Sequence, residues 1–316
     1  MQTFYRRLLR LMPRIGVQVT DIAPGTALVS RSATPLTVTG ADKGTWIVRR
    51  AKGGAGDHAD ADARAVRLGG TGALLLMDGA ARHDERGLQL AAAEYLCAQH
   101  VTAMLALYDA NCVFDVGANS GQYARRLRRL GYTGRIVSFE PTSKAFAELE
   151  KAAAQDPDWH VHRCGLGRTE TTAEIHTGWK TMNSLLGPSD YGKDRYSRFH
   201  TSDTEEIRVR RLDAVMDEAL DGLADPRPYL KMDTQGYDLE VFAGAGKRVG
   251  EFVGMQSEVA VLRLYEGSPG MGEAVATYEA AGFGITGMYP VTREAATGRV
   301  IEFDCVLMRA DAAPLR

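Results

Sequence analysis

The chain has 316 residues, of which 45% are apolar and 25% are charged, a composition typical of globular proteins with a large buried core. Its 38 basic and 40 acidic residues give a formal net charge of −2, which argues against binding nucleic acid over the whole surface. The four cysteines form no CxxC pair, which excludes a cysteine zinc site and a disulfide scaffold and favours a reducing cytoplasm. No apolar stretch approaches the roughly 20 residues of a membrane helix, so we expect no membrane span.

The first 110 residues carry weak and interrupted signals. Arginines alternate with apolar residues at helical spacing in residues 1–15, which predicts a basic amphipathic helix on the surface. The glycine-rich and Asp/Ala-rich segment Lys52–Gly70 predicts a loop, and Leu88–Tyr108 predicts a helix that bends near Gln99–His100. Short apolar runs predict strands at Ala27–Ser30, Thr45–Val48 and Ala73–Met77.

From Cys112 onward, predicted strands and helices alternate regularly. We expect helices at Gln122–Leu130, Lys144–Gln155, Leu239–Val249 and Gly272–Ala281. We expect strands at Cys112–Val116, Arg135–Phe139, Trp159–Cys164, Tyr229–Met232 and Phe252–Glu258, a strand pair at Ala173–Thr177 and Ile207–Arg210, and a final hairpin of Phe283–Val291 and Val300–Met308. This alternation predicts an α/β fold with a mostly parallel sheet, to which the hairpin adds antiparallel strands. Ligands of such sheets bind at the carboxyl ends of the strands.

A glycine-containing turn, Asp115-Val-Gly-Ala-Asn-Ser-Gly121, follows the first of these strands and opens a helix. Gly117 allows a sharp turn, and Gly121 allows the start of the helix to approach a ligand. Glu140 ends the next strand, where an acid can accept hydrogen bonds from both ribose hydroxyls of an adenosine cofactor. The order of strand, turn, helix, strand and acid therefore predicts a cofactor site.

The turn favours S-adenosylmethionine over a nicotinamide dinucleotide. Asn119 and Gln122 stand where the dinucleotide fingerprint needs glycines beside the pyrophosphate. S-adenosylmethionine has no phosphates, and Asp115 could attract its cationic amino group while the helix N-terminus takes its carboxylate. After the third strand, the backbone amides of Gly165 and Leu166 could reach the adenine.

The densest polar cluster, Asp233-Thr-Gln-Gly-Tyr-Asp, ends the central strand at the predicted switch point. Asp233 is the first candidate for the base that takes the proton of an acceptor hydroxyl, and its alternative role is to cap the next helix. Lys231, within the same strand, needs a buried partner, for which Glu258 and Asp115 are candidates. Glu258 is also a second candidate base.

Several residues are candidates for contact with the acceptor. The segment Trp179–Ser202 mixes aromatic, amide and hydroxyl side chains, as expected of a lid, and His200 at its end could lie over the pocket. Asp304 should lie near the same rim, although a solvated position in the hairpin is the other interpretation. His160 and His162 share one face of a strand without a third ligand at a suitable spacing, so we expect no metal.

Taken together, these segments resemble the FkbM-type S-adenosylmethionine-dependent methyltransferases, in order from about Val113 to Met308, some two thirds of the chain. The segments that carry the resemblance are VFDVGANSGQYARRLRRLGYTGRIVSFEPTSKAFAEL, HVHRCGLG, NSLL, RVRRLDAV, YLKMDTQGYDLEVFAGAG, MQSEVAVLRLYEG and EFDCVLMR. The resemblance implies a Rossmann-like class I methyltransferase fold with a seven-stranded sheet. It also implies methylation of a hydroxyl on a sugar, a glycoside, another glycan or a polyketide-type natural product.

Carried over by position, the resemblance assigns roles to residues of this chain. Asp233 and Gln235 would line the transfer site, and Asn183-Ser184 matches a serine-rich patch, with Asn183 in place of a serine. The residues that would bind the cofactor are Asp115, Gly117, Asn119, Gly121 and Glu140.

We therefore expect residues 111–316 to form a cytoplasmic methyltransferase domain, with residues 1–110 as an N-terminal α/β cap that contacts the acceptor or a second copy in a homodimer. A competing hypothesis is an RNA methyltransferase, because Lys180, Lys193, Arg195 and Arg198 interleave with aromatic residues. Against it, aspartates dilute that charge, and the Pro-Pro-aromatic turn that grips a flipped base is missing at Asp233. Two further hypotheses are a nicotinamide oxidoreductase, which the glycine turn opposes, and a module that binds the cofactor without catalysis.

Overall fold

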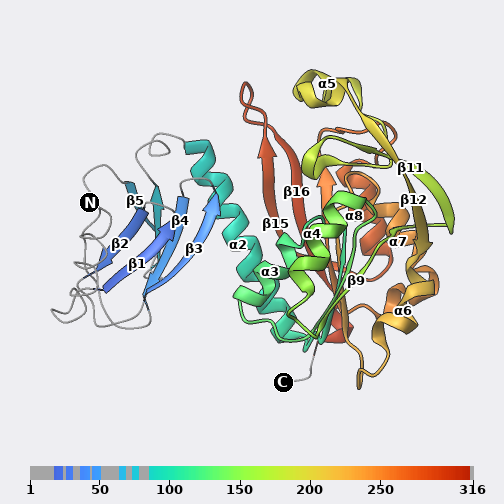
Figure 1. Cartoon of the computed structure of the whole chain (residues 1–316), viewed down its shortest axis with the longest axis horizontal. Coiled ribbons are helices and arrows are strands. Elements are labelled where there is room, and N and C mark those ends of the chain that lie inside the picture. Colours follow the sequence, from blue (N-terminus) through green and yellow to red (C-terminus); the bar gives the residue numbers. More distant parts are fainter. Residues whose placement is uncertain are drawn as a thin grey trace. The chain divides into compact units, whose positions relative to one another are not determined.

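The computed structural model describes residues 18–23, 26–30, 36–42, 45–50, 64–68, 73–77 and 85–313, and the basic helix expected in residues 1–15 lies outside them (Figure 1). The chain divides into two compact units, Met1–Tyr95 and Leu96–Arg316.

The first unit contains two antiparallel sheets. One pairs β1 (Gln18–Ala23) with β2 (Thr26–Ser30). The other has the order β3-β4-β6-β5, with bounds Leu36–Asp42, Thr45–Arg50, Ala73–Met77 and Arg64–Leu68. The loop expected over Lys52–Gly70 is therefore wrong at Arg64–Leu68, because this segment pairs with β6 along its whole length. Its other residues lie outside the described ones.

Helix α2 (Glu85–Leu107) runs without interruption past Gln99–His100. Ala91 and Tyr95 pack with Ile47 in the first unit, whereas the later turns are buried in the core of the second unit. Among the described helices, α2 alone is long and apolar enough to cross a membrane, and a third of that stretch is buried.

The second unit is built around a seven-stranded sheet with the order β15-β16-β14-β13-β7-β8-β9 (Figure 1). Its strands, in that order, are Gly284–Arg293, Val300–Met308, Gly254–Ala260, Pro228–Met232, Cys112–Val116, Arg135–Phe139 and Trp159–His162. The five strands from β14 to β9 are parallel, and β16 and β15 are antiparallel. The expected mostly parallel α/β sheet with a terminal hairpin is confirmed.

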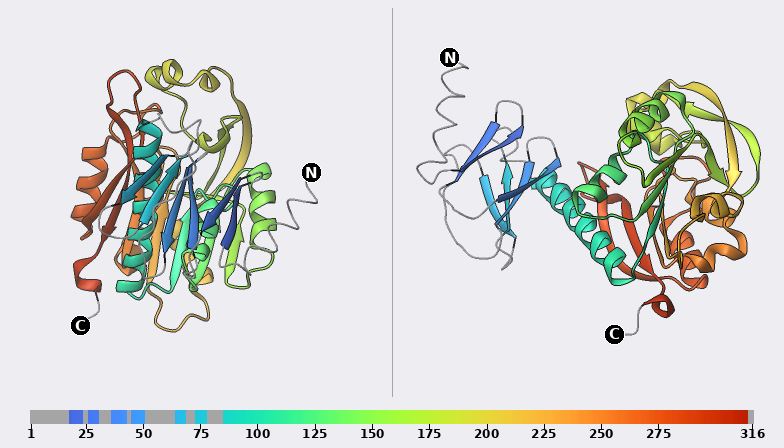
Figure 2. Two further views of the ribbon diagram at one scale, coloured as in Figure 1. Left: turned by 90° about the vertical axis from the view of Figure 1, so that its left-hand side faces the viewer. Right: turned by 60° about the horizontal axis from the view of Figure 1, so that its bottom comes forward.

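Helices cover both faces of this sheet (Figure 2). Buried residues of α2, α3 (Gln122–Arg129) and α4 (Ser143–Ala153) pack in one core cluster. Those of α6 (Leu212–Leu220), α7 (Asp238–Gly244) and α8 (Met271–Ala280) pack in the other. The helix expected over Leu239–Val249 stops early, because α7 gives way to a 3-10 turn, η5 (Gly246–Glu251).

A second sheet of three strands, β10-β12-β11, flanks the first and was expected only as a strand pair. Its strands are Gly165–Gly167, Asp203–Arg211 and Thr171–Thr177. The strand expected over Trp159–Cys164 therefore ends at His162, and the chain changes sheet before Gly165. Between β11 and β12 lie the 3-10 turns η3 (Lys180–Met182) and η4 (Ser197–His200) and helix α5 (Asp190–Arg195). Trp179 and Phe199 hold this segment on Leu264, Tyr265 and Ile301.

Candidate functional site

A cavity of about 230 Å³ lies at the carboxyl ends of β7, β8 and β13. It combines residues that are distant in sequence, from the glycine turn, the ends of four neighbouring strands, the flanking sheet and the segment after η3. The predicted site residues that line it are Gly117, Asn119, Glu140, Gly165, Leu166, Asn183, Ser184, Asp233, Gln235 and Asp304. The predicted residues Asp115, Gly121, Glu258 and His200 do not line it.

The glycine turn is held against the end of the central strand. Gly117 has a φ of +76°, and a Cβ atom there would lie 2.0 Å from the main-chain oxygen of Asp233. Asn119 also has a left-handed φ of 49°, and its main-chain N–H donates to the Glu140 carboxylate. Gly121 has φ +83° and packs on the Trp159 ring rather than on the cavity. The close approach that we expected of Gly121 is thus made to a side chain of the core.

Glu140 joins the glycine turn to the turn after β8. Its Oε2 accepts from the Asn119 amide at 2.9 Å, and its Oε1 accepts from the Thr142 amide at 2.9 Å. Burial raises the pKa of this carboxyl, and the hydrogen bonds from Thr142 and Asn119 oppose that rise. Oε1 also accepts from the Thr142 hydroxyl at 2.5 Å, so the acceptor capacity that the carboxylate retains for a ribose hydroxyl lies at Oε2.

A row of buried polar residues crosses the sheet beneath the cavity. Ser138, Asp115, Lys231 and Gln256 occupy the same register on β8, β7, β13 and β14. The ammonium of Lys231 lies 3.0 Å from Asp115 Oδ1 and donates to the Gly117 carbonyl at 3.3 Å. Burial disfavours this ammonium, yet Asp115 and Asp233 outweigh it and raise the pKa of Lys231. The expected pairing of Lys231 with Asp115 is thus present.

The other expected partner of Lys231, Glu258, takes a different contact. Its Oε2 accepts from Gln235 Nε2 at 2.9 Å, and the same amide donates to Asp233 Oδ1 at 2.8 Å. Glu258 borders a separate cavity of about 20 Å³ together with Glu302. Burial, together with the nearby charge of Glu302, raises the pKa of Glu258 well above its usual range. Glu258 does not line the main cavity, so Asp233, which does, is better placed to take a proton from an acceptor bound there.

Asp233 is the carboxylate at the switch point, with a side chain that is 42% exposed. Its Oδ2 lies 3.7 Å from the Lys231 ammonium. Gln235, in a left-handed conformation, also accepts at Oε1 from the Tyr265 hydroxyl at 2.8 Å. The capping role considered for Asp233 is absent, because the N-cap of α7 is Tyr237 and no side chain caps this helix. Asp233 is thus held in place and open to the cavity.

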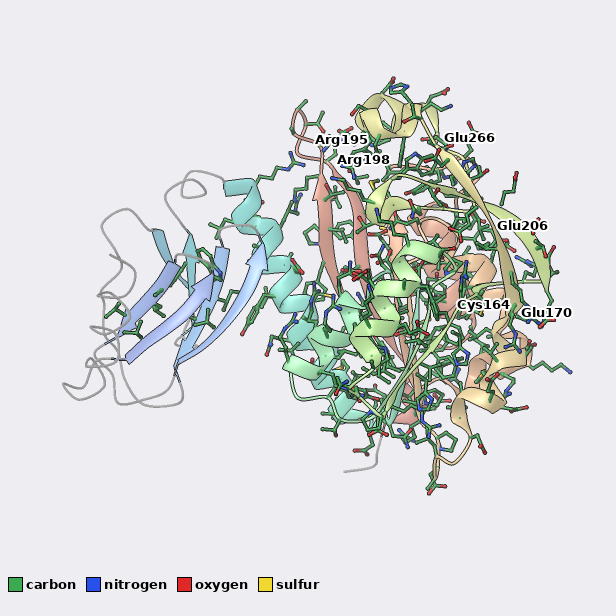
Figure 3. The ribbon with its side chains drawn as sticks, viewed as in Figure 1. Cys164, Glu170, Arg195, Arg198, Glu206 and Glu266 are labelled. Carbon is green, nitrogen blue, oxygen red and sulfur yellow. The ribbon has the colours of Figure 1, made fainter. Side chains whose placement is uncertain are left out.

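The end of the cavity toward β8 and the flanking sheet is apolar. Phe139, Leu166, Ile175 and Ile207 line it with Cys164, which Figure 3 labels. The main chain of Gly165 and Leu166 forms β10 here, as expected near an adenine, and the Ile207 side chain lies next to Gly165. Sequence reasoning did not assign Ile175 or Ile207 to the site. The signal available was the alternation of apolar and polar residues in a strand predicted next to the cofactor site.

The segment after η3 forms part of the rim. Ser184 donates to the main-chain oxygen of Gln235 at 2.7 Å, and Asn183 accepts from the Trp179 amide. His200 is exposed in η4. Two basic residues of this segment, Arg195 and Arg198, lie over the Tyr196 ring. Figure 3 labels both arginines.

The opposite end of the cavity, toward β14 and β16, is polar. Asp304 lies in mid-strand rather than in a solvated hairpin position, and its Oδ1 accepts from Gln256 Nε2 at 2.9 Å. The side-chain oxygen of Gln256, Oε1, accepts in turn from the Tyr123 hydroxyl at 3.2 Å. Arg126 lines the same end. We did not predict Tyr123, Arg126 or Gln256, because only the packing of α3 against the sheet brings the first two beside β14. Within the described ranges, no cluster of three His, Cys, Asp or Glu side chains is arranged to hold a metal ion.

Comparisons with known proteins identify the family of the chain. A family model described as "Methyltransferase FkbM domain" matches residues 115–284, more than half of the chain. No curated protein matches the chain. Similar solved structures include Aeropyrum pernix fibrillarin with natively bound S-adenosyl-L-methionine, which is 12% identical with a TM-score of 0.40 and covers 87% of this chain and 100% of that one. Another is the Synechocystis magnesium protoporphyrin IX methyltransferase with bound cofactor, which is 10% identical with a TM-score of 0.37 and covers 72% and 85% of the two chains.

Proposed function

The chain belongs to the methyltransferase FkbM domain family, and from this premise we propose that it methylates a hydroxyl group of a sugar, a glycoside or a polyketide-type natural product. It is an S-adenosylmethionine-dependent methyltransferase. The nature of the acceptor is the proposed part. The observation that supports a hydroxyl acceptor is the Asp233 carboxylate, open to the cavity at the switch point of the sheet.

The residues present fit S-adenosylmethionine. The apolar end accommodates a purine, and Glu140 retains an acceptor position at Oε2 for a ribose hydroxyl. When bound, the cofactor supplies an electrophilic methyl group on a sulfonium. The residues of this chain then have to orient a nucleophile and remove its proton.

Asp233 performs the proton step in this proposal. The bound cofactor would supply the methyl group to the acceptor oxygen, and the Asp233 carboxylate would take the proton of the acceptor hydroxyl. Gln235, fixed by Tyr265 and Glu258, holds Asp233 through its amide. A positioned base of this kind contributes about 10²- to 10⁴-fold in rate.

An acceptor screen tests the proposal. Extracts of cells that lack the enzyme are incubated with the protein and a methyl-labelled donor, and labelled products are identified by mass spectrometry. We expect an O-methyl ether that Asp233→Asn makes about 100-fold more slowly or worse, with little change in affinity for S-adenosylhomocysteine. A labelled product that is destroyed by ribonuclease would instead support the RNA methyltransferase. Binding of S-adenosylhomocysteine without any labelled product would support a non-catalytic module.

The front of the chain has a proposed role of its own. We propose that residues 1–110 contribute acceptor specificity or the contacts of a homodimer, and that the enzyme acts in the cytoplasm, in natural-product or saccharide biosynthesis. Analytical ultracentrifugation of the full chain tests the dimer.

A further inference from the structure

The cofactor's amino-acid end needs an anionic partner that the sequence did not identify. We expected Asp115 to attract the α-ammonium group. In the structure Asp115 is fully buried, lies outside the cavity lining and is paired with the Lys231 ammonium at 3.0 Å. An α-ammonium group bound next to Lys231 without its own carboxylate would face one positive charge with another.

Because of the order of the strands, one end of the cavity is apolar and the other is polar. Its apolar wall comes from β8 and the flanking sheet, on one side of β7. Its polar wall, formed by Lys231, Gln256 and Asp304, comes from β13, β14 and β16 on the other side. Glu140, the acid for the ribose, follows β8. A ligand with its purine at the apolar wall and its ribose at Glu140 therefore extends its remaining atoms toward the polar wall.

Among the described residues, three carboxylates line this cavity, and two of them are already engaged by neighbouring cations or amides. Glu140 receives the amides of Asn119 and Thr142, and Asp233 receives Gln235 and lies 3.7 Å from Lys231. Asp304 receives Gln256 on Oδ1, whereas its Oδ2 faces the weak thiol donor of Cys97, at 3.9 Å. Because Glu140 serves the ribose and Asp233 takes the acceptor proton in the proposed function, Asp304 is the carboxylate that remains for the ammonium group.

We propose that Asp304 binds the α-ammonium group of S-adenosylmethionine, and that Gln256, itself held by Tyr123, orients the Asp304 carboxylate for this contact. Lys231 and Arg126 at the same end provide positive charge for the α-carboxylate. This inference rests on the proposed cofactor site and not on the identity of the acceptor.

The test compares ligands that differ only at the amino-acid end. S-adenosylhomocysteine carries the whole amino acid, its deaminated analogue lacks the ammonium group, and 5′-methylthioadenosine lacks the amino acid. Their affinities are measured by calorimetry for the full chain and for Asp304→Asn. The matched control is Glu302→Gln, which removes a buried carboxylate two residues away on the same strand that lines only the small second cavity.

We expect Asp304→Asn to bind S-adenosylhomocysteine roughly 10- to 100-fold more weakly, as the loss of one charge-assisted hydrogen bond implies. Its affinity for the deaminated analogue and for 5′-methylthioadenosine should stay within about twofold of the wild type, and Glu302→Gln should leave all three unchanged. Equal losses for all three ligands, or no loss for S-adenosylhomocysteine, would overturn the proposal. If the wild type binds 5′-methylthioadenosine but shows only background binding of S-adenosylhomocysteine, the proposal about Asp304 fails, whereas a nucleoside site remains. If it binds neither, the proposed function fails as well.

The wild type offers a second readout that needs no folded variant. Burial raises the pKa of Asp304 to about 6, opposed by the Gln256 hydrogen bond and by Lys231 and Arg126. Because a protonated carboxyl cannot pair with an ammonium group, affinity for S-adenosylhomocysteine should fall about tenfold per pH unit below about 6. Affinity for the deaminated analogue should not fall in this way, and parallel curves for both ligands would contradict the proposal. The charged and titratable groups that face Asp304 are Cys97, Tyr123, Arg126, Lys231, Asp233, Glu258, Glu302 and Tyr289.

Discussion

Two loops border the cavity, the cofactor turn and the loop after β13. Gly117 belongs to the cofactor turn and packs against the loop after β13. Its left-handed φ alone would penalise an alanine by about 1–2 kcal/mol. The main-chain oxygen of Asp233, 2.0 Å from the position of a Cβ atom, adds a clash that no side-chain rotation can relieve. The residue therefore sets the distance between the cofactor turn and the proposed base.

We expect Gly117→Ala to reduce affinity for S-adenosylhomocysteine more than about tenfold and to lower the free energy of unfolding by more than the φ penalty of about 1–2 kcal/mol. The matched control is Gly131→Ala, which has a similar φ of +94° but nothing within 4 Å of its Cβ position. Urea unfolding and calorimetry measure both effects. Equal behaviour of the two variants would show that backbone conformation alone matters at Gly117.

The pair of Lys231 and Asp115 presents a different kind of constraint, because both side chains are buried. Lys231→Met should lower the free energy of unfolding by about 3–5 kcal/mol, since it leaves an uncompensated buried carboxylate. The double variant Lys231→Met/Asp115→Asn should recover a large part of that loss. Urea unfolding at neutral pH measures the cycle, and additive losses would contradict the coupling.

At the scale of the elements, sequence reasoning worked best where turn residues bound a short, mostly apolar run on both sides. The expected bounds of β7 and β8, Cys112–Val116 and Arg135–Phe139, are those of the structure, because turn residues flank each run. It failed where pairing with a neighbouring strand decides the structure or the position of a residue. Arg64–Leu68 became a strand by pairing with β6, and Asp304 became a cavity residue through its register opposite Glu258.

The same limit applied to the site. The glycine turn, Glu140, Asp233 and Gln235 each follow one strand and could be read in sequence as part of one site. The row from Ser138 to Gln256 spans four strands whose order no local pattern contains. Sequence reasoning therefore found the residues that follow the strands and the pair of Lys231 and Asp115, and missed Ser138 and Gln256 at the two ends of the row.

The flanking sheet is the element that closes the apolar end, through Ile175 and Ile207. We expect Ile207→Ala to weaken binding of 5′-methylthioadenosine about tenfold, because it removes apolar contact worth about 0.8 kcal/mol per methylene. Val209→Ala is the matched control, since Val209 is buried in the same small cluster but does not line the cavity. Both truncations should cost stability, whereas calorimetry should detect lost affinity only for Ile207→Ala. A similar loss for Val209→Ala would mean that the sheet acts only as support.

At the scale of the whole molecule, the boundary between the two units falls within helix α2, after Tyr95. Cys97, Val101 and Leu105 of that helix are all buried in the core of the second unit. A fragment of residues 85–316 keeps these three side chains and should therefore fold and bind S-adenosylhomocysteine within about threefold of the full chain. Losing the three core side chains would cost about 2–5 kcal/mol each. A fragment of residues 109–316 should be strongly destabilised. Circular dichroism and calorimetry compare them, and full stability of the shorter fragment would show that α2 is dispensable.

The four buried thiols of the second unit have a practical consequence. Cys164 lines the apolar end of the cavity, and Cys97 touches Asp304 at the polar end. Burial raises the pKa of Cys164 to about 11, so alkylation in the native state has to wait for a local opening. Mass spectrometry of alkylated peptides would then record, in one experiment, which end of the cavity a ligand closes. A nucleoside should slow modification at Cys164 alone, whereas a ligand with its amino acid intact should slow it at both cysteines.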